Sequence, residues 1–371
     1  MVLGLLPAIR GGLGELAKTG QHTRLIDAYL RPYARAFEEV LYFSYLAESL
    51  EAYETDRELG ARVRLLPGGG WHPWAYGFVM PVRYSRELRR CSILRVFQVT
   101  GALPAVIAKR RFGTPFVTTY GFWYGRLARS RATRALRRVV ETLGLRAADA
   151  VIVTTRELAA HVGARIGGAK VHLIPNGVDT ALFAPAARGP RRRRNVLYVG
   201  RLSEEKNLGA LVDAAAALAE RFDLTLTFIG DGPSRSPLEA HARRLNVAAE
   251  FIPVVEHRRV PAHLADADAF VLPSFTEGHP KALLEAMSAG VPCVASNVGG
   301  NRAVLEHSVT GLLFELGDRA ALAESLTRVL ADPGLARTLG ERARARVLEC
   351  YDLARLVAEE IELLKRLARA G

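Results

Sequence analysis

The apolar positions of the chain form short continuous runs rather than an alternating pattern. The runs are rich in Val, Ile and Leu, as in residues 2–7 (VLGLLP), 149–155 (DAVIVTT) and 195–200 (NVLYVG). A continuous run of this kind indicates a strand buried on both faces, which is typical of a parallel sheet covered by helices. Because the runs alternate with stretches of helical periodicity, the pattern predicts a series of βαβ units.

The series is interrupted once, by the segment 186–195 (AARGPRRRRN). This segment has no periodicity and is rich in Pro, Gly and Arg, so we interpret it as a linker. We therefore predict an α/β protein with two Rossmann-like, doubly wound domains that face each other across a cleft. The predicted domains are residues 1–186 and 187–352.

Length and composition agree with this organisation. A chain of 371 residues is longer than one domain with a single hydrophobic core usually is, and its length fits two domains. The three cysteines, Cys91, Cys293 and Cys350, have no CxxC spacing, so we expect neither a disulfide framework nor a zinc site, and we infer a reducing compartment. The sequence has no signal-peptide pattern and no long apolar window, so we expect a cytoplasmic protein.

The formal net charge of +13 is high for such a protein. Only six of the 51 basic residues are Lys, so solubility and genome composition are the simplest explanations of the excess. Residues 126–143 predict an amphipathic helix with Val139 and Leu143 on its apolar face and arginines on the other. We favour an ordinary surface helix, with contact of the Arg face to an anionic membrane as the alternative. We find no nucleic-acid recognition motif.

Candidate chemistry lies in the loops that follow the predicted strands, where parallel α/β sheets bind ligands. In the stretch 274–300, Glu277 follows a strand and Pro280 stands at a plausible first helical position. A helix dipole explains an acidic residue at Glu277. It does not explain Glu285, which lies among apolar residues and needs a partner there, such as the hydroxyls of a sugar or a ribose.

A second loop carries two cations. Arg201 directly follows a predicted strand, and Lys206 lies at the start of the next helix. Two cations beside a helix N-terminus form an anion site, and a diphosphate matches it. The opening segment 11–20 (GGLGELAKTG) is also glycine-rich, but Ala17 replaces the second glycine of a Walker loop, so it predicts either a different phosphate loop or a simple turn.

Several motifs together resemble the retaining GT-B glycosyltransferases of family 4. These are IPNGVD (174–179), VGRL…EKN (199–207), IGDG (229–232), VLPSFTEGHPKALLEAMSAGVPCVASNVGG (271–300) and TGLLF (310–314). The resemblance implies an acceptor-side N-terminal domain and a donor-binding C-terminal domain. It also implies that the last helix, 353–371, packs back on the first domain.

The resemblance assigns roles to residues of this chain. Arg201 and Lys206 would hold and stabilise the leaving diphosphate, Glu277 would face the donor sugar, and Glu285 would accept the ribose hydroxyls. The rest of the donor site would consist of Gly11, Gly12, Gly230, Asp231, Gly232, Gly278, His279, Pro280, Lys281, Ala282 and Leu283.

The reaction implied is transfer of a hexosyl group from a nucleotide diphosphate sugar, such as a UDP- or GDP-hexose, to a hydroxyl acceptor. The family retains the anomeric configuration through same-face attack, and it implies no metal and no cofactor. A lipid-linked acceptor and a peripheral position at the inner face of the membrane are compatible with the basic charge.

The chain departs from the family where a donor-side His is common, because Tyr120 stands at that place and we expect it to substitute. Trp71 and His72 lie in a glycine-rich loop and could form a wall for the sugar or acceptor, or Trp71 could pack in the core. Two alternative functions remain, a non-catalytic nucleotide-sugar-binding protein and a GT-B-like sugar-nucleotide epimerase.

Overall fold

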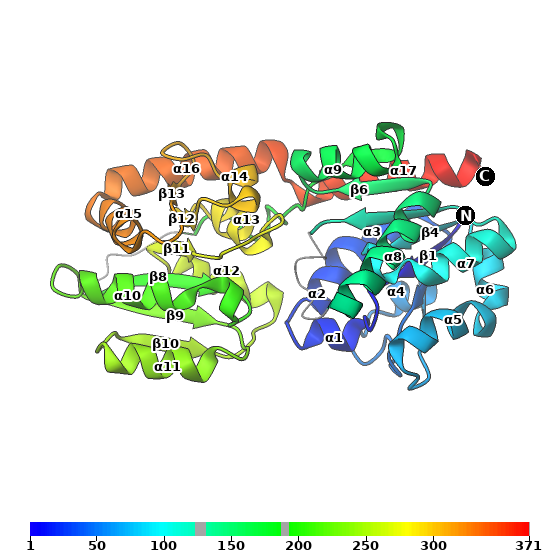
Figure 1. The fold of residues 1–371 in the computed structure, drawn as a ribbon, viewed down its shortest axis with the longest axis horizontal. Helices are drawn as coiled ribbons and strands as arrows, with labels where there is room; N and C mark the ends of the chain where they lie inside the picture. Colours follow the sequence, from blue (N-terminus) through cyan, green and yellow to red (C-terminus); the bar gives the residue numbers. More distant parts are fainter. Residues whose placement is uncertain (123–130, 187–192, 371) are drawn as a thin grey trace. The chain divides into compact units, whose positions relative to one another are not determined.

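The computed structural model describes residues 1–122, 131–186 and 193–370, and the side chains of 131–137 and 319 are outside the description. It divides the chain into two compact units (Figure 1). The first unit contains Met1–Pro175 and Ala354–Gly371, and the second contains Asn176–Leu353. The chain therefore leaves the first unit once and returns to it with its last helix.

The first unit is built on a seven-stranded sheet with the order β3-β2-β1-β4-β5-β6-β7. Every pairing in it is parallel, and β1, β2 and β4 are almost entirely buried, so the continuous apolar runs are confirmed as doubly covered parallel strands. The strands are β1 (Val2–Leu6), β2 (Glu39–Phe43), β3 (Val63–Leu66), β4 (Ile93–Val96), β5 (Phe116–Tyr120), β6 (Ala150–Val153) and β7 (Val171–Leu173).

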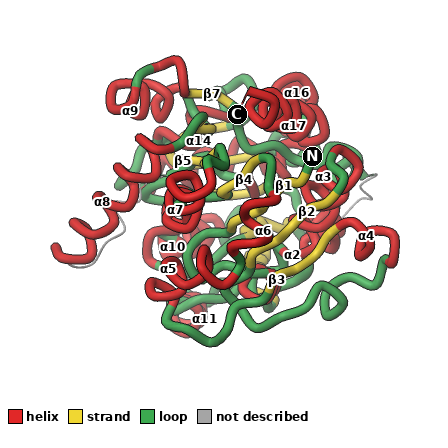
Figure 2. The backbone as a smooth tube through the Cα atoms, turned by 90° about the vertical axis from the view of Figure 1, so that its right-hand side faces the viewer, coloured by secondary structure: helices red, strands yellow, loops and turns green. Residues whose placement is uncertain are grey.

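Helices cover both faces of this sheet, with α5 and α7 on one side and α3 and α17 on the other (Figure 2). The helices are α1 (Leu13–Ala17), α2 (His22–Leu25), α3 (Arg31–Ala36), α4 (Arg57–Arg62), α5 (Pro73–Arg83), α6 (Ser85–Arg90), α7 (Leu103–Phe112), α8 (Arg131–Ala147), α9 (Arg156–Ile166) and α17 (Leu353–Ala370), with a π-helical segment at Ile26–Leu30.

The last helix, α17, is fixed to the first unit by a buried ion pair. Glu360 on α17 accepts a hydrogen bond from Arg95 Nε on β4 at 2.6 Å, and both side chains are about 95% buried. The Tyr33 hydroxyl on α3 donates to the same carboxylate. Burial and then the charge of Glu360 raise the pKa of Tyr33 well above its usual value, so the phenol stays protonated as the donor.

The second unit contains a six-stranded parallel sheet with the order β10-β9-β8-β11-β12-β13. Its strands are β8 (Arg194–Val199), β9 (Leu224–Ile229), β10 (Ala249–Ile252), β11 (Ala269–Leu272), β12 (Cys293–Ser296) and β13 (Leu312–Phe314). Its helices are α10 (Leu208–Leu218), α11 (Arg235–Arg244), α12 (Val260–Ala265), α13 (Lys281–Ser288), α14 (Gly299–Val304), α15 (Arg319–Ala331) and α16 (Pro333–Cys350). The predicted α/β class with two Rossmann-like units is confirmed.

The division between the units falls before the segment that we interpreted as a linker. Phe183 is fully buried in the core of the second unit, and Val178 N–H donates to the Tyr351 carbonyl at 2.9 Å. Residues 176–186 therefore belong to the second unit, and the boundary lies at Pro175 rather than at residue 186. In the described part of the chain, no helix combines the length and apolar character that crossing a membrane requires.

Candidate active site

The candidate site lies where the strand order of the second sheet reverses. Strand β8 is hydrogen-bonded to β9 on one side and to β11 on the other. The strands β9 and β10 therefore extend the sheet to one side of β8, and the later strands β11, β12 and β13 extend it to the other. Ligands of open α/β sheets bind beyond the carboxyl ends of the strands at such a switch point. The loops 200–207 after β8 and 273–280 after β11 occupy this position.

These loops are fixed by backbone contacts that require glycine. A Cβ atom on Gly230 would lie 2.0 Å from the Gly200 carbonyl oxygen, and one on Gly232 would lie 2.3 Å from the Leu202 carbonyl oxygen. Both glycines also have positive φ values, 136° and 156°. Gly230 and Gly232 therefore allow the loop after β9 to pack directly against the loop after β8. Asp231 Oδ1 accepts a hydrogen bond from Gly232 N–H at 2.8 Å.

The structure brings Lys206 and Glu277 together from the two loops. Lys206 Nζ lies 2.6 Å from Glu277 Oε1, and the Ser274 hydroxyl donates to the same oxygen at 2.7 Å. The two charged side chains are 20% and 10% exposed, so this ion pair is only partly screened by water. Arg201 is exposed, and its carbonyl accepts a hydrogen bond from the Tyr198 hydroxyl at 2.9 Å.

Helix α13 begins beside this pair without a side-chain cap. Its N-cap residue is Pro280, which makes no side-chain hydrogen bond to the first backbone N–H groups of the helix. These N–H groups carry the positive end of the helix dipole. Lys281 is exposed, whereas Leu283 is fully buried, so Leu283 can contribute to a ligand site only through its backbone.

His279 supports the loop through its backbone rather than through its charge. Its carbonyl accepts a hydrogen bond from Asn176 Nδ2 at 2.8 Å, and its ring packs edge-on against Tyr351. Burial and then the charge of Lys281 lower the pKa of His279 to about 3, so the ring is neutral at physiological pH.

The backbone of the neighbouring Gly278 packs closely against Gly300. A Cβ atom on Gly300 would lie 2.6 Å from the Gly278 carbonyl oxygen and 2.5 Å from the Glu277 carbonyl carbon. Gly300 is therefore part of the site, because its lack of a Cβ atom lets the loop that carries Glu277 pass this close to it.

Glu285 is buried on α13, and the structure supplies a protein partner for it. His257 Nε2 lies 2.9 Å from Glu285 Oε1, and the two side chains are about 95% buried. The partner that this carboxylate was expected to need is thus supplied by the chain itself, and its contact with a ribose stays a prediction. A buried carboxylate does need a partner, but a histidine 28 positions away provides it.

In the first unit, three N–H groups in and after the opening glycine turn donate to acceptors of the protein itself. Gly11 N–H donates to the Ala8 carbonyl at 2.7 Å. Glu48 accepts from Leu13 N–H at 2.9 Å and from Gly14 N–H at 2.7 Å. A carboxylate of the chain itself thus caps α1, and the placing of Gly11 and Gly12 at a donor diphosphate stays a prediction.

Gly12 leaves space at this turn for the Glu48 and Ser44 side chains. Its backbone is extended, but a Cβ atom there would lie 2.6 Å from both Glu48 Oε1 and Ser44 Oγ. Lys18 pairs with Glu15 at 2.6 Å, and the Thr19 hydroxyl donates to the Leu16 carbonyl, so both residues close the end of α1. The segment is a glycine-rich turn and not a Walker loop.

Of the three residues predicted on the acceptor side, one is buried and two are exposed. Tyr120, at the end of β5, is 2% exposed and stacks on His161 inside the core, so it does not present its ring as a substitute for a donor-side His. Trp71 is 54% exposed and His72 is also exposed, at the N-cap of α5. Trp71 is therefore not a core residue.

The predicted amphipathic helix 126–143 is only partly described. Residues 126–130, and the side chains up to Arg137, lie outside the described residues. In the described part, Val139 and Leu143 are 55% and 44% exposed, whereas Glu141 and Leu145 are buried. The predicted assignment of Val139 and Leu143 to the inward face is wrong, because α8 turns its Glu141–Leu145 side to the core.

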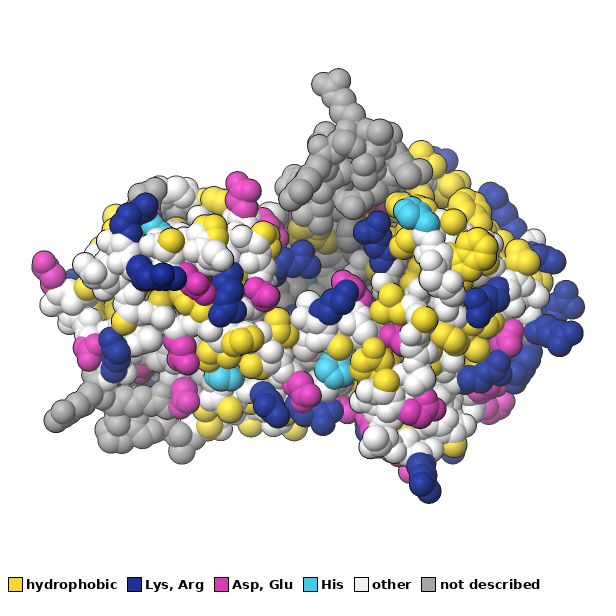
Figure 3. All heavy atoms as spheres, turned by 90° about the horizontal axis from the view of Figure 1, so that it is seen from below, with side chains coloured by type: hydrophobic (Ala, Val, Ile, Leu, Met, Phe, Trp, Pro, Cys, Tyr) yellow, Lys and Arg dark blue, Asp and Glu magenta, His cyan; other side chains and the backbone are white. Residues whose placement is uncertain are grey.

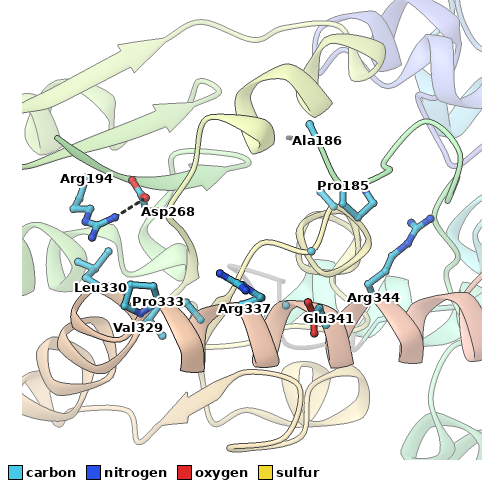
Figure 4. A pocket seen from close by; sticks show the side chains of 14 residues that line it. Pro185, Ala186, Arg194, Asp268, Val329, Leu330, Pro333, Arg337, Glu341 and Arg344 are labelled. Atoms are coloured by element: carbon cyan, nitrogen blue, oxygen red, sulfur yellow. Dashed lines mark hydrogen bonds and ion pairs between the residues drawn. The ribbon is translucent and has the colours of Figure 1, made fainter. Parts of the chain in front are cut away.

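A cavity of about 550 Å³ in the second unit lies away from these loops (Figure 4). It is bordered by Arg194 at the start of β8 and by Asp268 just before β11, which pair at 3.3 Å. It therefore opens at the amino edge of the sheet, opposite the switch-point loops. None of Arg201, Lys206, Glu277 and Glu285 lines it.

Sequence reasoning missed several residues that support these loops and the turn into α1. Asn176 lies inside the IPNGVD motif and Ser274 inside the longest motif, so the motifs contained them without showing what they contact. Glu48 and His257 had no local signal, since their partners lie 34 to 35 and 28 positions away.

Comparison with known proteins follows the same division of the chain. Residues 19–182 match the family model described as "Glycosyltransferase Family 4", and residues 185–346 match the model "Glycosyl transferases group 1". Among solved structures, sucrose-phosphate synthase from Thermosynechococcus elongatus is similar over 100% of both chains, with a TM-score of 0.85 and 23% identity. Anabaena HepE, solved in complex with UDP-glucose, has a TM-score of 0.79 and 20% identity over 98% of this chain and 99% of its own.

Two curated relatives extend the comparison. The UDP-Gal:alpha-D-GlcNAc-diphosphoundecaprenol alpha-1,3-galactosyltransferase of Escherichia coli is 29% identical over 68% of this chain and 69% of its own length. A glycogen synthase of Mycobacterium tuberculosis is 32% identical over 68% of this chain and 63% of its own length. The two units thus have the fold of GT-B glycosyltransferases. The chain belongs to family 4 of these enzymes.

Proposed function

We propose that this glycosyltransferase transfers a hexosyl group from a nucleotide diphosphate sugar to a hydroxyl acceptor with retention of configuration. The observation that carries the proposal is the cluster at the second unit's switch point. There, Arg201 and Lys206 lie on the loop after β8, and Lys206 pairs with Glu277 on the loop that leads into α13, whose N-cap residue makes no side-chain cap hydrogen bond. Fixed positive charge of this kind suits a diphosphate.

The chemistry follows from where charge develops. The bond between the anomeric carbon and the phosphate oxygen breaks through an oxocarbenium-like state, and the diphosphate gains negative charge as it leaves. Arg201, Lys206 and the first N–H groups of α13 stabilise that charge more in the transition state than in the ground state. The acceptor oxygen attacks the same face of the sugar, and its proton passes to the leaving phosphate.

Glu277 has two tasks in this proposal. Its Oε1 accepts hydrogen bonds from Lys206 Nζ and from the Ser274 hydroxyl, so it holds the ammonium group of Lys206 in place. Its Oε2 makes neither of these contacts and is assigned to a hydroxyl of the donor sugar. Glu285 is assigned to the ribose only in addition to its bond with His257. The reaction is proposed to need no metal ion and no cofactor.

Donor and acceptor are proposed by similarity. Anabaena HepE has been solved with UDP-glucose, which makes a UDP-hexose the first donor to test and a GDP-hexose the second. The Escherichia coli relative is named for a diphosphoundecaprenol-linked acceptor, which makes a lipid-linked hydroxyl compound the first acceptor class to test.

The test combines binding and turnover with the full chain. Thermal-shift measurements with UDP, GDP and ADP identify the base, because a ligand that binds only the folded state raises its apparent stability. Transfer and donor hydrolysis are then measured for wild type, Arg201→Ala, Lys206→Ala and the surface control Arg243→Ala, with and without a chelator. We expect kcat to fall roughly 100-fold or more in the first two variants. The control should match wild type, and the chelator should leave the rate unchanged.

The alternatives give different results in the same assay. Nucleotide binding with equal, background-level rates in all four proteins would replace the proposal with a non-catalytic binding protein. Conversion of the donor into its epimer without an acceptor would indicate an epimerase.

A further inference from the structure

Helix α5 of the first unit is apolar all round. Its sequence, PWAYGFVMPVR, has no charged residue before Arg83. Tyr76 and Met80 are buried in the core, but Phe78 and Val82 on the opposite side are 59% and 63% exposed. A soluble helix normally has a polar outer face, so this helix has an apolar face that the described residues leave uncovered.

The exposed apolar residues form one continuous stripe. Ala75, Phe78 and Val82 follow the helical spacing of three and four residues, so they share one face of α5. Trp71, two positions before the helix begins at Pro73, is 54% exposed. Contiguous large apolar side chains on a surface mark an interaction site rather than ordinary surface composition.

Cations border this stripe. A Cβ atom on Gly69 would lie 2.6 Å from Arg83 Nη1 and 3.2 Å from Trp71 Cδ1, so the guanidinium and the indole approach the same point. The following helix α6 and the end of α7 present further exposed arginines, which are Arg86, Arg89, Arg110 and Arg111. Figure 3 shows hydrophobic side chains gathered on one side of the molecule with Lys and Arg around them.

Acidic side chains are almost absent from this part of the sequence. Between Trp71 and Phe112 the only acidic residue is Glu87, and Arg64 Nη2 pairs with its carboxylate at 2.9 Å. This stretch of the chain therefore carries an excess of positive charge, even with Glu39 from β2 paired to Arg90 of α6 at 2.6 Å, and a partner must accept both apolar side chains and cations.

We propose that the α5 stripe (Trp71, Phe78 and Val82) and its arginine border dock on an anionic lipid surface. The apolar side chains enter the boundary between headgroups and acyl chains, where Trp and Phe are favoured, and the arginines contact the phosphates. A symmetric contact between two copies of this chain fits less well, because it would bring arginine borders of like charge together. The proposal does not depend on glycosyl transfer.

The test is co-sedimentation of the full chain with vesicles, without donor or acceptor. Vesicles of phosphatidylglycerol and phosphatidylcholine are compared with vesicles of phosphatidylcholine alone. We expect wild type to bind the anionic vesicles, and this binding should weaken as salt is added. The double variants Phe78→Ser/Val82→Ser and Arg86→Glu/Arg89→Glu should each bind roughly tenfold or more weakly. All four positions are exposed, so thermal unfolding should confirm that both variants fold.

A matched control changes exposed leucines of the second unit, Leu245→Ser/Leu348→Ser, and should bind as wild type does. Equal binding by wild type and both α5-side variants, or no binding by wild type, would overturn the proposal. A concentration-dependent dimer in size-exclusion chromatography that the Phe78→Ser/Val82→Ser variant loses, without vesicle binding, would assign the stripe to a second copy instead. Loss of transferase activity with normal vesicle binding would contradict only the proposed function.

Discussion

At the scale of single residues, His279 is a buried base kept neutral by its surroundings. Its pKa is lowered to about 3, whereas a histidine in an unfolded chain titrates near 6.5. Between these values the unfolded chain binds a proton that the folded chain does not, so stability falls as the pH is lowered through this window. The variant His279→Phe keeps an aromatic ring against Tyr351 and should lose this dependence, which amounts to at most about 1.4 kcal/mol per pH unit.

The measurement is urea unfolding of wild type and His279→Phe at several pH values between about 4 and 7. The matched control is His72→Phe, which makes the same replacement at an exposed position. Parallel profiles for wild type and His279→Phe would show that His279 titrates alike in the folded and the unfolded chain, which would contradict its lowered pKa.

Variants of the Glu285–His257 pair distinguish a structural role of Glu285 from a ligand-binding role. Glu285→Leu and His257→Leu each leave the remaining polar partner buried, so each should lower the free energy of unfolding by about 1–3 kcal/mol. Because the two residues are in contact, the double variant should lose less than the sum. Glu285→Gln preserves a hydrogen-bonding group and should be milder in stability, while its affinity for UDP reports any contact with the ribose.

Additive losses in the double variant would show that the two side chains do not interact. Unchanged UDP affinity in Glu285→Gln would remove the ribose from the list of its partners and leave the carboxylate a purely structural role.

At the scale of elements, the turn into α1 depends on the space that Gly12 leaves for Glu48. Gly12→Ala would force its Cβ atom against Glu48 Oε1 and Ser44 Oγ, and the carboxylate that caps Leu13 and Gly14 would have to move. We expect a loss of about 1–3 kcal/mol in the free energy of unfolding. Gly60→Ala is the matched comparison, because nothing lies within 4 Å of that Cβ position in α4 and alanine favours a helix by about 0.5–1 kcal/mol.

Chemical denaturation of the two variants should therefore give shifts of opposite sign. A neutral Gly12→Ala variant would mean that the Glu48 cap adapts without cost, and Glu48→Gln should then be neutral as well.

The elements were predictable from sequence where local patterns determine them. Continuous apolar runs predicted the parallel strands, and the positions just after those runs predicted Arg201, Lys206 and Glu277 on the loops of one edge. That inference works because the carboxyl ends of parallel strands share one edge of a sheet.

The failures concern packing partners that no local pattern encodes. The helical wheel placed Leu143 inward, but α8 approaches its neighbours through Gly144, where a Cβ atom would lie 2.8 Å from the Ala102 Cβ atom. That close approach fixes the rotation of the helix and exposes Leu143. Tyr120 was assigned to a ligand by analogy with a motif, whereas its ring fills the core beside His161.

At the scale of the whole molecule, the chain returns to its first unit through α17, and Glu360 fixes that return. Arg95, Glu360 and the Tyr33 hydroxyl form a buried cluster between β4, α17 and α3. Removing one partner of a buried ion pair leaves an uncompensated charge and typically costs about 3–5 kcal/mol. We expect Glu360→Ala to destabilise the first unit by this amount and to leave the second unit unaffected.

Amide hydrogen exchange resolves the two units where a single melting curve would not, because two-state unfolding is not assured in a chain with two cores. Peptides covering β1 and β4 should lose protection in Glu360→Ala, while those covering β8 and β11 should keep it. Glu362→Ala on the same helix is the control, since that side chain is 75% exposed and should change neither set. An equal loss of protection in both units would show that they unfold as one cooperative body, so that the return of α17 stabilises the entire chain rather than one half of it.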